Sequence, residues 1–468
     1  MVEQLSSDEH AELGAVGLEQ NPALFTDLYE LTMAAVYHSR QLNEPATFEL
    51  FVRELPPSRG YLVVCGVESA LDYLERFSVE ERGITYLESL GLFSSSFLSF
   101  LAALRFSGDV WAIPEGEVAF AGEPLLRVTA PLVEAQLVET IMLNCIGYET
   151  MVATNAARIA TACADRAFVD FSARRSHGFD AALKAAHAAQ VGGAASTSLV
   201  LAGQAYGLEL SGTMAHSYVM RFNDEREAFA SFARAFPGRA VLLLDTYDTR
   251  EAARRVVELA DKLRGEGALP YGVRLDSGDL DLLSRSVRSI LDAAGLRELR
   301  IFASGNLDEY RVAELVAAGA PIDGFGIGTQ LVASSEAPAL DTAYKLVEDA
   351  TGPKLKLSEG KATLPGRKQL HRVIEAGRYV YDVLGLQDET VTEGHPLLEQ
   401  AMAQGTRTRA HESLGVASER CRTARAALAD SVLALDPAPE HYEVRLTRGL
   451  TLVRDQLQRA HLPAGPSG

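Results

Sequence analysis

Short hydrophobic runs recur about every 30 residues through the middle of the chain, and each is followed by polar side chains. The runs lie at 167–171, 208–211, 240–245, 271–275, 300–303 and 323–327. Between them, apolar residues return with helical spacing, most clearly over 250–263, 280–294 and 308–318. Strands that alternate with helices in this way predict a parallel sheet, either open or closed into a barrel.

The two ends of the chain have a different pattern. The front part predicts a helix over 26–38, capped by Thr26 or Asp27, and then short strands at 46–52, at 61–65 and within 110–128. After about residue 345 the chain is irregular, with a β-like run at 376–383, a helix at 416–434 and a strand-like run at 443–447. The front part is therefore typical of an α+β arrangement that differs from the middle.

Polar side chains follow the predicted strands of the middle region more densely than simple connections require. In chain order they include Arg174, Arg175, Asp245, Arg274, Asp276, Asp279, Ser304, Gly305, Gly326, Gly328 and Thr329. The carboxyl ends of parallel strands share one face of the sheet, where ligands bind. Any one cluster is explained by a helix cap and a turn, but several together predict a binding site.

The residue types at this face indicate the chemistry of the ligand. Glycine turns at 304–305 and 326–329 can direct backbone N–H groups at a phosphate, although no Walker A loop is present. Asp276 and Asp279 suit the hydroxyls of a sugar or Mg²⁺. Arg174 and Arg175 can pair with a carboxylate or a phosphate. Together they predict a sugar phosphate with metal-bound anionic groups, and an acidic small molecule beside it.

The segment 211–217 carries a further candidate, His216, directly after the apolar run 208–210. A glycine turn there presents a hydroxyl, backbone N–H groups and an imidazole together. Such a turn can hold an anion, and its imidazole can accept a phosphoryl group. The alternative is a strand-to-helix connection with a capping Ser or Thr, which is the better explanation of this segment taken alone.

Composition excludes several classes of partner. The chain of 468 residues has a net charge of −19, which argues against nucleic acid or an anionic membrane as a partner. No apolar run approaches the roughly 20 residues of a membrane span, and the acidic beginning of the chain is unlike a signal peptide. The four cysteines are scattered without metal-binding spacing, which favours a reducing compartment and makes the cytoplasm the expected location.

Five segments, taken in order, resemble the nicotinate phosphoribosyltransferase family. They are TDLYELTM at 26–33, FVRELPPSRGY at 51–61, GTMAHS at 212–217, VRLDSGD at 273–279 and GIGT at 326–329. The resemblance extends from about residue 22 to about residue 385. Each motif is weak alone, and their shared order makes the resemblance specific.

The resemblance implies an α/β fold, with an irregular α/β barrel and a second α/β sandwich-like domain built from the N-terminal part and the chain after the barrel. The expected divisions are an N-terminal arm (1–22), the sandwich-like domain (23–150), the barrel (151–348), a return segment (349–440) and a C-terminal strand and tail (441–468). The family also implies a homodimer with shared active sites.

The resemblance further implies a reaction in NAD biosynthesis. Nicotinate attacks C1 of phosphoribosyl pyrophosphate, giving nicotinate mononucleotide and pyrophosphate, and ATP is hydrolysed through a phosphohistidine that maps to His216. Asp276 and Asp279 are the expected catalytic carboxylates and Mg²⁺ ligands. The expected substrate-binding residues are Tyr29 on the nicotinate ring, Arg174 or Arg175 with Thr213 and Arg274 around its carboxylate, and Ser304, Gly305, Gly326, Gly328 and Thr329 on the 5′-phosphate.

Three alternatives stay open. In a related family that takes nicotinamide, an acidic residue follows the Gly-Thr pair, whereas this chain has Met214, which favours a carboxylate substrate. The quinolinate-specific relative is shorter and lacks the ATP-linked histidine. A non-catalytic nucleotide-binding protein would not need Asp276, Asp279 and His216 beside phosphate-binding turns.

Overall fold

The computed structural model describes residues 22–333, 338–358, 362–436 and 442–461. Most of the expected N-terminal arm and the last residues of the expected tail lie outside these ranges. The chain divides into two compact units: unit 1 comprises residues 1–151 and 339–468, and unit 2 comprises residues 152–338. Among the described residues, no helix combines the length and apolar character that a membrane span needs.

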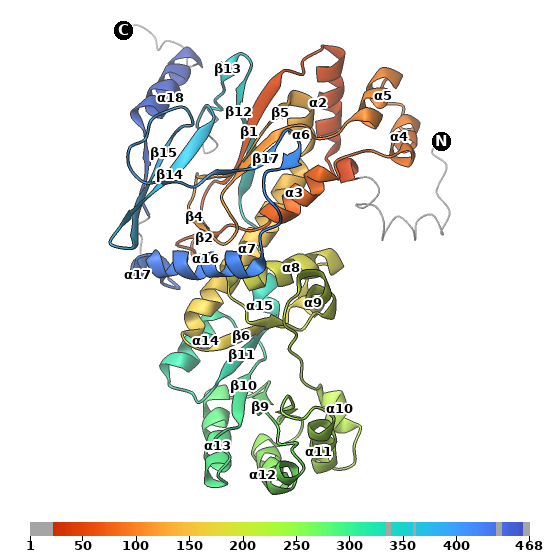
Figure 1. Cartoon of the computed structure of the whole chain (residues 1–468), viewed down its shortest axis with the longest axis vertical. Helices are drawn as coiled ribbons and strands as arrows, with labels where there is room; N and C mark the ends of the chain where they lie inside the picture. Colours follow the sequence, from red (N-terminus) through yellow and green to blue (C-terminus); the bar gives the residue numbers. More distant parts are fainter. Residues whose placement is uncertain (1–21, 334–337, 359–361, 437–441, 462–468) are drawn as a thin grey trace. The chain divides into compact units, whose positions relative to one another are not determined.

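Unit 1 is built on a seven-stranded sheet that joins the two ends of the chain (Figure 1). Its order is β13 (Gly352–Pro353), β12 (Thr342–Asp349), β1 (Pro45–Val52), β5 (Pro124–Pro131), β3 (Asp109–Ala112), β17 (Glu399–Ala403) and β18 (Thr406–Arg407). β1 is antiparallel to both β12 and β5. Residues 342–348, which we expected at the end of the barrel, therefore belong to the sheet of unit 1.

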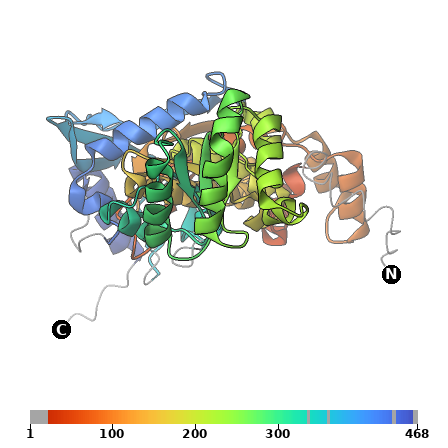
Figure 2. The same ribbon diagram turned by 90° about the horizontal axis from the view of Figure 1, so that it is seen from below.

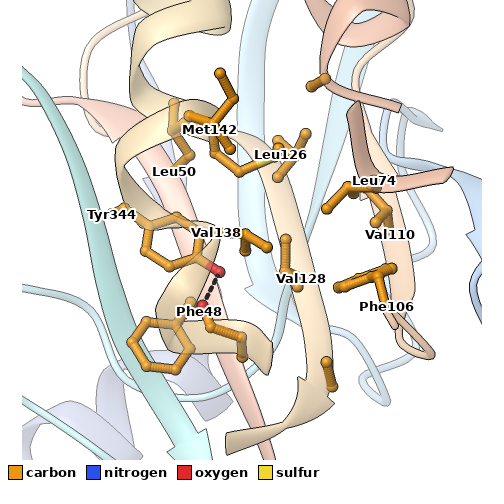
Figure 3. Packing of buried hydrophobic residues seen from close by; sticks show 14 of the residues in the cluster. Phe48, Leu50, Leu74, Phe106, Val110, Leu126, Val128, Val138, Met142 and Tyr344 are labelled. Atoms are coloured by element: carbon orange, nitrogen blue, oxygen red, sulfur yellow. Dashed lines mark hydrogen bonds between the residues drawn. The ribbon is translucent and has the colours of Figure 1, made fainter. Parts of the chain in front are cut away.

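Helices and a buried apolar cluster cover this sheet. The helical elements are η1 (Pro22–Leu24), α2 (Leu28–Ser39), α3 (Val67–Glu75), α4 (Glu81–Ser89), α5 (Ser95–Ala103), α6 (Leu132–Leu137) and the start of α7 (Glu139–Cys163). Figure 3 shows Phe48 and Leu50 of β1 with Leu126, Val138 and Tyr344 in one cluster. The rings of Phe48 and Tyr344 stack at 5.0 Å, and the Tyr344 hydroxyl donates to the Ala135 carbonyl at 2.8 Å.

A second sheet of unit 1 contains the last strands of the chain. Its order is β16 (His395–Pro396), β14 (Lys368–Glu375), β15 (Arg378–Leu386) and β19 (Val444–Leu446), with a separate pair of β2 (Leu62–Val63) and β4 (Val118–Ala119). The predicted helix at 416–434 is divided into α16 (Leu414–Ala427) and α17 (Asp430–Leu433). After β19 we expected a tail, but the chain forms helix α18 (Arg448–His461). Among the described residues of this helix only Leu450 is fully buried, so the helix leaves little apolar pattern in the sequence.

Unit 2 contains the predicted parallel sheet. Its order is β7 (Ser196–Thr197), β6 (Ala167–Asp170), β11 (Gly324–Ile327), β10 (Arg300–Ala303), β9 (Gly272–Leu275) and β8 (Val241–Leu243). The predicted strand at 208–211 is reduced to a parallel bridge between Leu210 and Thr197. This curled, half-open sheet is the irregular barrel that we expected, and it occurs with a separate sheet-rich unit as the family resemblance implied.

Helices separate the strands of unit 2 along the chain. They are α8 (Phe179–Gly192), α9 (Val200–Tyr206), α10 (His216–Met220), α11 (Glu225–Ala235), α12 (Thr249–Gly265), α13 (Leu280–Ala293), α14 (Glu309–Ala317) and α15 (Thr329–Val332), with η2 (Ala173–Arg175). Figure 2 shows α11, α12 and α13 (green) side by side. The carboxylates of Asp248, Asp279 and Asp308 accept from backbone N–H groups three residues further on, at 2.8, 3.2 and 2.7 Å.

Candidate active site

The candidate site lies in unit 2, where the carboxyl ends of five neighbouring strands meet. Because β6, β11, β10, β9 and β8 are adjacent and parallel, the residues that follow them share one edge of the sheet. Ser304 after β10 thus lies between Gly326 of β11 and Asp276 after β9. The topology brings together the clusters that the sequence predicted to converge.

Arg274 of β9 connects these strand ends. Its Nε donates to Ser304 Oγ at 2.9 Å, its Nη1 donates to Thr213 Oγ1 at 2.8 Å, and its Nη2 contacts Asp276 Oδ1 at 2.9 Å. Its guanidinium carbon also lies 5.6 Å from the centre of the Phe171 ring. A single planar cation therefore fixes three of the predicted site residues and stacks on an aromatic ring.

Asp276 is the anionic centre of the site. Burial raises the pKa of its carboxyl, but hydrogen bonds from Ser304 and Arg274, with the charges of Arg274 and His216, bring the pKa below its usual value. Asp276 is therefore ionised near neutral pH. Its Oδ1 is held by Arg274 and by the Ser304 hydroxyl, while its Oδ2 faces His216.

His216 stands beside this carboxylate at the start of α10. Its Nε2 lies 4.0 Å from Asp276 Oδ2, and its Nδ1 lies 3.2 Å from Thr246 Oγ1. Its side chain is 41% exposed, so the ring has access to solvent. The segment 211–217 thus meets the strand ends, as its predicted role requires.

A cavity of about 210 Å³ opens beside the carboxylate. Its lining includes Arg174, Arg175, Asp276, Ser304, Gly305, Gly326, Gly328 and Thr329 from the predicted set. Gly305 has a φ of +91°, and a Cβ there would lie 1.9 Å from the Asp276 carbonyl oxygen. A Cβ on Gly326 would lie 2.5 Å from the Phe171 ring. Both glycines are needed for this close approach of backbone and ring.

Arg174 and Arg175 bring positive charge to the cavity. They lie in η2, directly after β6, and both side chains are exposed. In the part of the chain that the structure describes, neither guanidinium has a carboxylate partner. Their charge is therefore available to an anionic ligand.

A larger cavity of about 600 Å³ adjoins the smaller one. The two share Phe171, Ser304 and Gly326 in their linings. Aromatic residues that include Phe232, Phe302 and Phe325 line the larger cavity, together with Thr213 and Arg274. The junction at Phe171 thus offers an aromatic ring beside an anion-binding space, which suits a flat ligand that carries an anionic group.

The structure places Asp279 and Asp245 in different surroundings. Asp279 is exposed, lines neither cavity and caps α13 through the Leu282 N–H. Asp245, to which we gave no role, lies at the site: its Oδ2 accepts from the Asp276 N–H at 3.2 Å and from the Ser277 hydroxyl. Its Oδ1 is buried and has no hydrogen-bond partner among the described residues. The position of Asp245 directly after a predicted strand was the signal for it.

Three other site residues had weaker signals. Phe171 and Asn306 line the smaller cavity, Thr246 contacts His216, and each lies one to three residues after the end of a strand. Tyr29, in contrast, lies on α2 of unit 1 with 47% of its surface exposed. Its predicted contact with the substrate ring stays a prediction.

Together, the half-open parallel barrel and the cation–carboxylate edge with its two cavities are typical of α/β proteins that bind a small anionic ligand at the carboxyl ends of their strands. Family models agree with this class. The nicotinate phosphoribosyltransferase N-terminal domain model matches residues 24–147, and the nicotinate phosphoribosyltransferase family model matches residues 166–369. The chain belongs to the nicotinate phosphoribosyltransferase family.

Individual relatives cover most of the chain. The chain is 50% identical over 389 residues to nicotinate phosphoribosyltransferase pncB2 of Mycobacterium tuberculosis, covering 83% of each chain. It is 40% identical over 381 residues to the Bacillus subtilis nicotinate phosphoribosyltransferase, covering 79% of this chain and 77% of that one. The crystal structure of human nicotinic acid phosphoribosyltransferase superposes with a TM-score of 0.84 at 29% identity, covering 92% of this chain and 99% of the human one.

Proposed function

We propose that the protein transfers the phosphoribosyl group of phosphoribosyl pyrophosphate to nicotinate, as a step of NAD biosynthesis. The pyridine nitrogen lone pair forms a bond to C1 while the bond from C1 to the pyrophosphate oxygen breaks. The products are nicotinate mononucleotide and pyrophosphate. The observation that carries this proposal is the network of Arg274, Asp276, Ser304 and Thr213 between two joined cavities.

The 210 Å³ cavity is the proposed site of the 5′-phosphate. Gly305 and Asn306 both have left-handed backbone, with φ of +91° and +49°, so the chain turns tightly at Ser304. Such turns can direct successive N–H groups at an anion. Gly326, Gly328 and Thr329 line the same cavity from the next strand.

The nicotinate ring is proposed to lie against Phe171, where the two cavities join. Arg274 already donates to three protein oxygens. Arg174 and Arg175, which line the smaller cavity and have no acid partner among the described residues, are therefore better placed to receive the carboxylate, while Thr213 lines the larger cavity. Tyr29 is proposed to stack on the ring from a second copy of the chain, as the shared active sites of the family's homodimer imply.

The carboxylates at this edge fit Mg²⁺. The buried Asp245 Oδ1 lacks a hydrogen-bond partner among the described residues, and Asp276 is anionic beside it. Oxygen donors of this kind are the ligands that Mg²⁺ prefers. We therefore assign Asp245 and Asp276 as candidate ligands in place of the predicted pair Asp276 and Asp279. A bound Mg²⁺ would neutralise charge on the leaving pyrophosphate.

ATP is proposed to phosphorylate His216. A neutral imidazole nitrogen attacks the γ-phosphorus, the bond to the β-phosphate oxygen breaks, and ADP leaves. Water later cleaves the phosphorus–nitrogen bond, releasing inorganic phosphate and restoring the imidazole. The exposure of the ring and its place beside Asp276 support this role. A cytoplasmic location is also proposed, because no disulfide joins the four buried cysteines in the described part of the chain.

Turnover with single substrates tests the proposal. The protein is incubated with Mg²⁺ and phosphoribosyl pyrophosphate, together with nicotinate, nicotinamide or quinolinate, and pyrophosphate release is followed. We expect release with nicotinate, because the buried Met214 offers no acid to read an amide. Turnover with nicotinamide alone would reject the carboxylate assignment. No turnover with any of the three would favour a non-catalytic nucleotide-binding protein.

A further inference from the structure

The His216 imidazole is contacted by two different strand ends. Thr246, which follows β8, lies 3.2 Å from Nδ1, and Asp276, which follows β9, lies 4.0 Å from Nε2. The Thr246 contact is the shorter of the two and is within hydrogen-bonding distance. The hydroxyl that contacts the ring therefore lies outside the motif that contains His216.

The backbone that presents Thr246 is fixed on both sides. Asp245 accepts hydrogen bonds from the Asp276 N–H and the Ser277 hydroxyl, which tie it to the end of β9. Asp248 accepts from the Glu251 N–H at 2.8 Å and so caps α12. Thr246 lies between these two anchors, so its hydroxyl has a defined position relative to β9.

The helix that carries His216 is docked separately. Tyr218 of α10 donates from its hydroxyl to the Ala228 carbonyl at 3.2 Å, and its ring packs edge-on against Phe232 at 5.6 Å. These contacts hold α10 through Tyr218 and do not involve the His216 ring.

We propose that Thr246 is the positioning residue of His216: its hydroxyl holds Nδ1 and thereby sets which edge of the imidazole faces Asp276. This inference rests on the proposed phosphorylation of His216. A hydroxyl can both donate and accept a hydrogen bond. Thr246 can therefore follow the change of donor and acceptor roles at Nδ1 as the ring gains and loses its phosphoryl group.

The loss of this contact would misplace the nucleophile without removing it. A ring that turns by 180° about χ2 exchanges Nδ1 with a carbon atom, and the nitrogen no longer meets Asp276 or the incoming phosphate correctly. Small errors in the position of reacting groups lower rates by up to about a hundredfold. The phosphoribosyl transfer itself uses other atoms and should be affected much less.

The test compares Thr246→Val, which keeps the shape but removes the hydroxyl, with Thr246→Ser, which keeps the hydroxyl. Tyr247→Phe is the matched control, because Tyr247 is the next residue in the loop and is 65% exposed. Phosphoenzyme formation from γ-labelled ATP is measured beside ATP-independent transfer. NMR of ¹⁵N-histidine-labelled protein, with the His216 signal assigned by His216→Gln, reports the tautomer and the environment of the ring.

We expect Thr246→Val to slow labelling about tenfold or more and to shift the His216 ring signals, while ATP-independent transfer stays within about twofold. Thr246→Ser and Tyr247→Phe should behave like the wild type. Wild-type labelling in Thr246→Val, or unchanged ring signals, would overturn the proposal. If the wild type is never labelled, the phosphohistidine proposal fails, and the ring signals still decide whether Thr246 holds the ring. If Thr246→Val does not fold, Thr246→Ala takes its place.

Discussion

Two arginine–aspartate pairs, one in each unit, use the same groups for different purposes. In unit 1, Arg372 contacts both oxygens of Asp382, at 3.0 and 2.6 Å, and the side chains are 1% and 0% exposed. In unit 2, Arg274 contacts a single oxygen of Asp276 at 2.9 Å, and the side chains are 14% and 27% exposed. The first pair is enclosed, whereas the second borders a cavity.

The surroundings of the two pairs explain the difference. Arg372 also donates to Glu117 and to the Val118 carbonyl, and Tyr442 donates to Asp382 Oδ1 at 3.0 Å. The charged groups of the Arg372–Asp382 pair therefore have their partners within the protein. Asp276, in contrast, keeps Oδ2 directed at His216 and the cavity. The Arg274–Asp276 pair, which leaves one carboxylate oxygen for a ligand, therefore indicates a binding site. The Arg372–Asp382 pair, whose charged groups are all paired within the protein, indicates a structural role.

The largest expected effect comes from removing each arginine. Arg372→Ala should lower the free energy of unfolding by about 3–5 kcal/mol, because it leaves Asp382 buried without its cation. Arg274→Ala should have a smaller effect on stability but reduce kcat/KM by about a hundredfold or more. Urea unfolding and steady-state kinetics on both variants measure the two effects. If Arg274→Ala destabilises the protein as severely as Arg372→Ala, Arg274 has a structural role like that of Arg372.

Gly305→Ala should have the next largest effect. The new Cβ would meet the Asp276 carbonyl oxygen at 1.9 Å on a backbone with φ of +91°, so the turn must move. We expect a loss of about 1–3 kcal/mol in stability and a raised KM for phosphoribosyl pyrophosphate. Gly265→Ala, at the end of α12 and away from both cavities, is the control, because no atom lies within 4 Å of its added Cβ. Equal effects of the two substitutions on KM would place the phosphate elsewhere.

The variants Asp276→Asn and Asp279→Asn compare the carboxylate that borders the cavity with the carboxylate that caps α13. Asp276→Asn should reduce turnover by more than about tenfold, equivalent to about 1.4 kcal/mol, because the anionic centre of the site is lost. Asp279→Asn should keep turnover within about threefold, since Asn is an equally good helix cap. A matching loss in Asp279→Asn would restore the catalytic role predicted from the sequence.

Glu30 of unit 1 is a buried carboxylate whose pKa is raised, whereas the pKa of Asp276 is lowered. Burial raises the pKa of Glu30 to about 7, although hydrogen bonds from Thr140 and Thr26 oppose the shift. Because the pKa of Glu30 is higher in the folded state than in the unfolded state, the folded state holds the carboxyl proton more tightly. The contribution of Glu30 to the free energy of unfolding is therefore complete below pH 4.5 and is lost as the pH rises through about 7.

Glu30→Gln should therefore be more stable than the wild type at pH 8, by up to about 3 kcal/mol, with little gain at pH 4.5. Thermal unfolding across this pH range measures the difference. Glu54→Gln, at an exposed position of the same unit, is the control. A constant difference between wild type and Glu30→Gln at every pH would contradict the raised pKa.

The sequence predicted the repeating part of the molecule best. Each strand of the barrel unit except the short β7 was anticipated, because buried parallel strands give continuous apolar runs. The strand at 208–211 and helix α18 were not correctly predicted, since a single bridge and a helix with little buried surface leave weak patterns.

Within the site, the sequence identified the residues that belong to recognisable motifs. It missed Asp245 and Thr246, whose roles depend on their contacts with other parts of the site. Arg274 and Ser304 were predicted, but their mutual hydrogen bond depends on the register of β9 against β10. Asp279 and Asp245 occupy similar positions after strands, and only the three-dimensional arrangement shows that Asp279 caps a helix while Asp245 accepts hydrogen bonds from Asp276 and Ser277. Thr246 has no sequence signal apart from its place after a strand.

The most direct test of the account is a crystal structure with nicotinate mononucleotide bound. The phosphate should lie in the cavity between 304–306 and 326–329, with the pyridine ring against Phe171 and its carboxylate near Arg174 or Arg175. A nucleotide bound away from these strand ends, with Arg274 and Asp276 untouched, would contradict the assignment of the site.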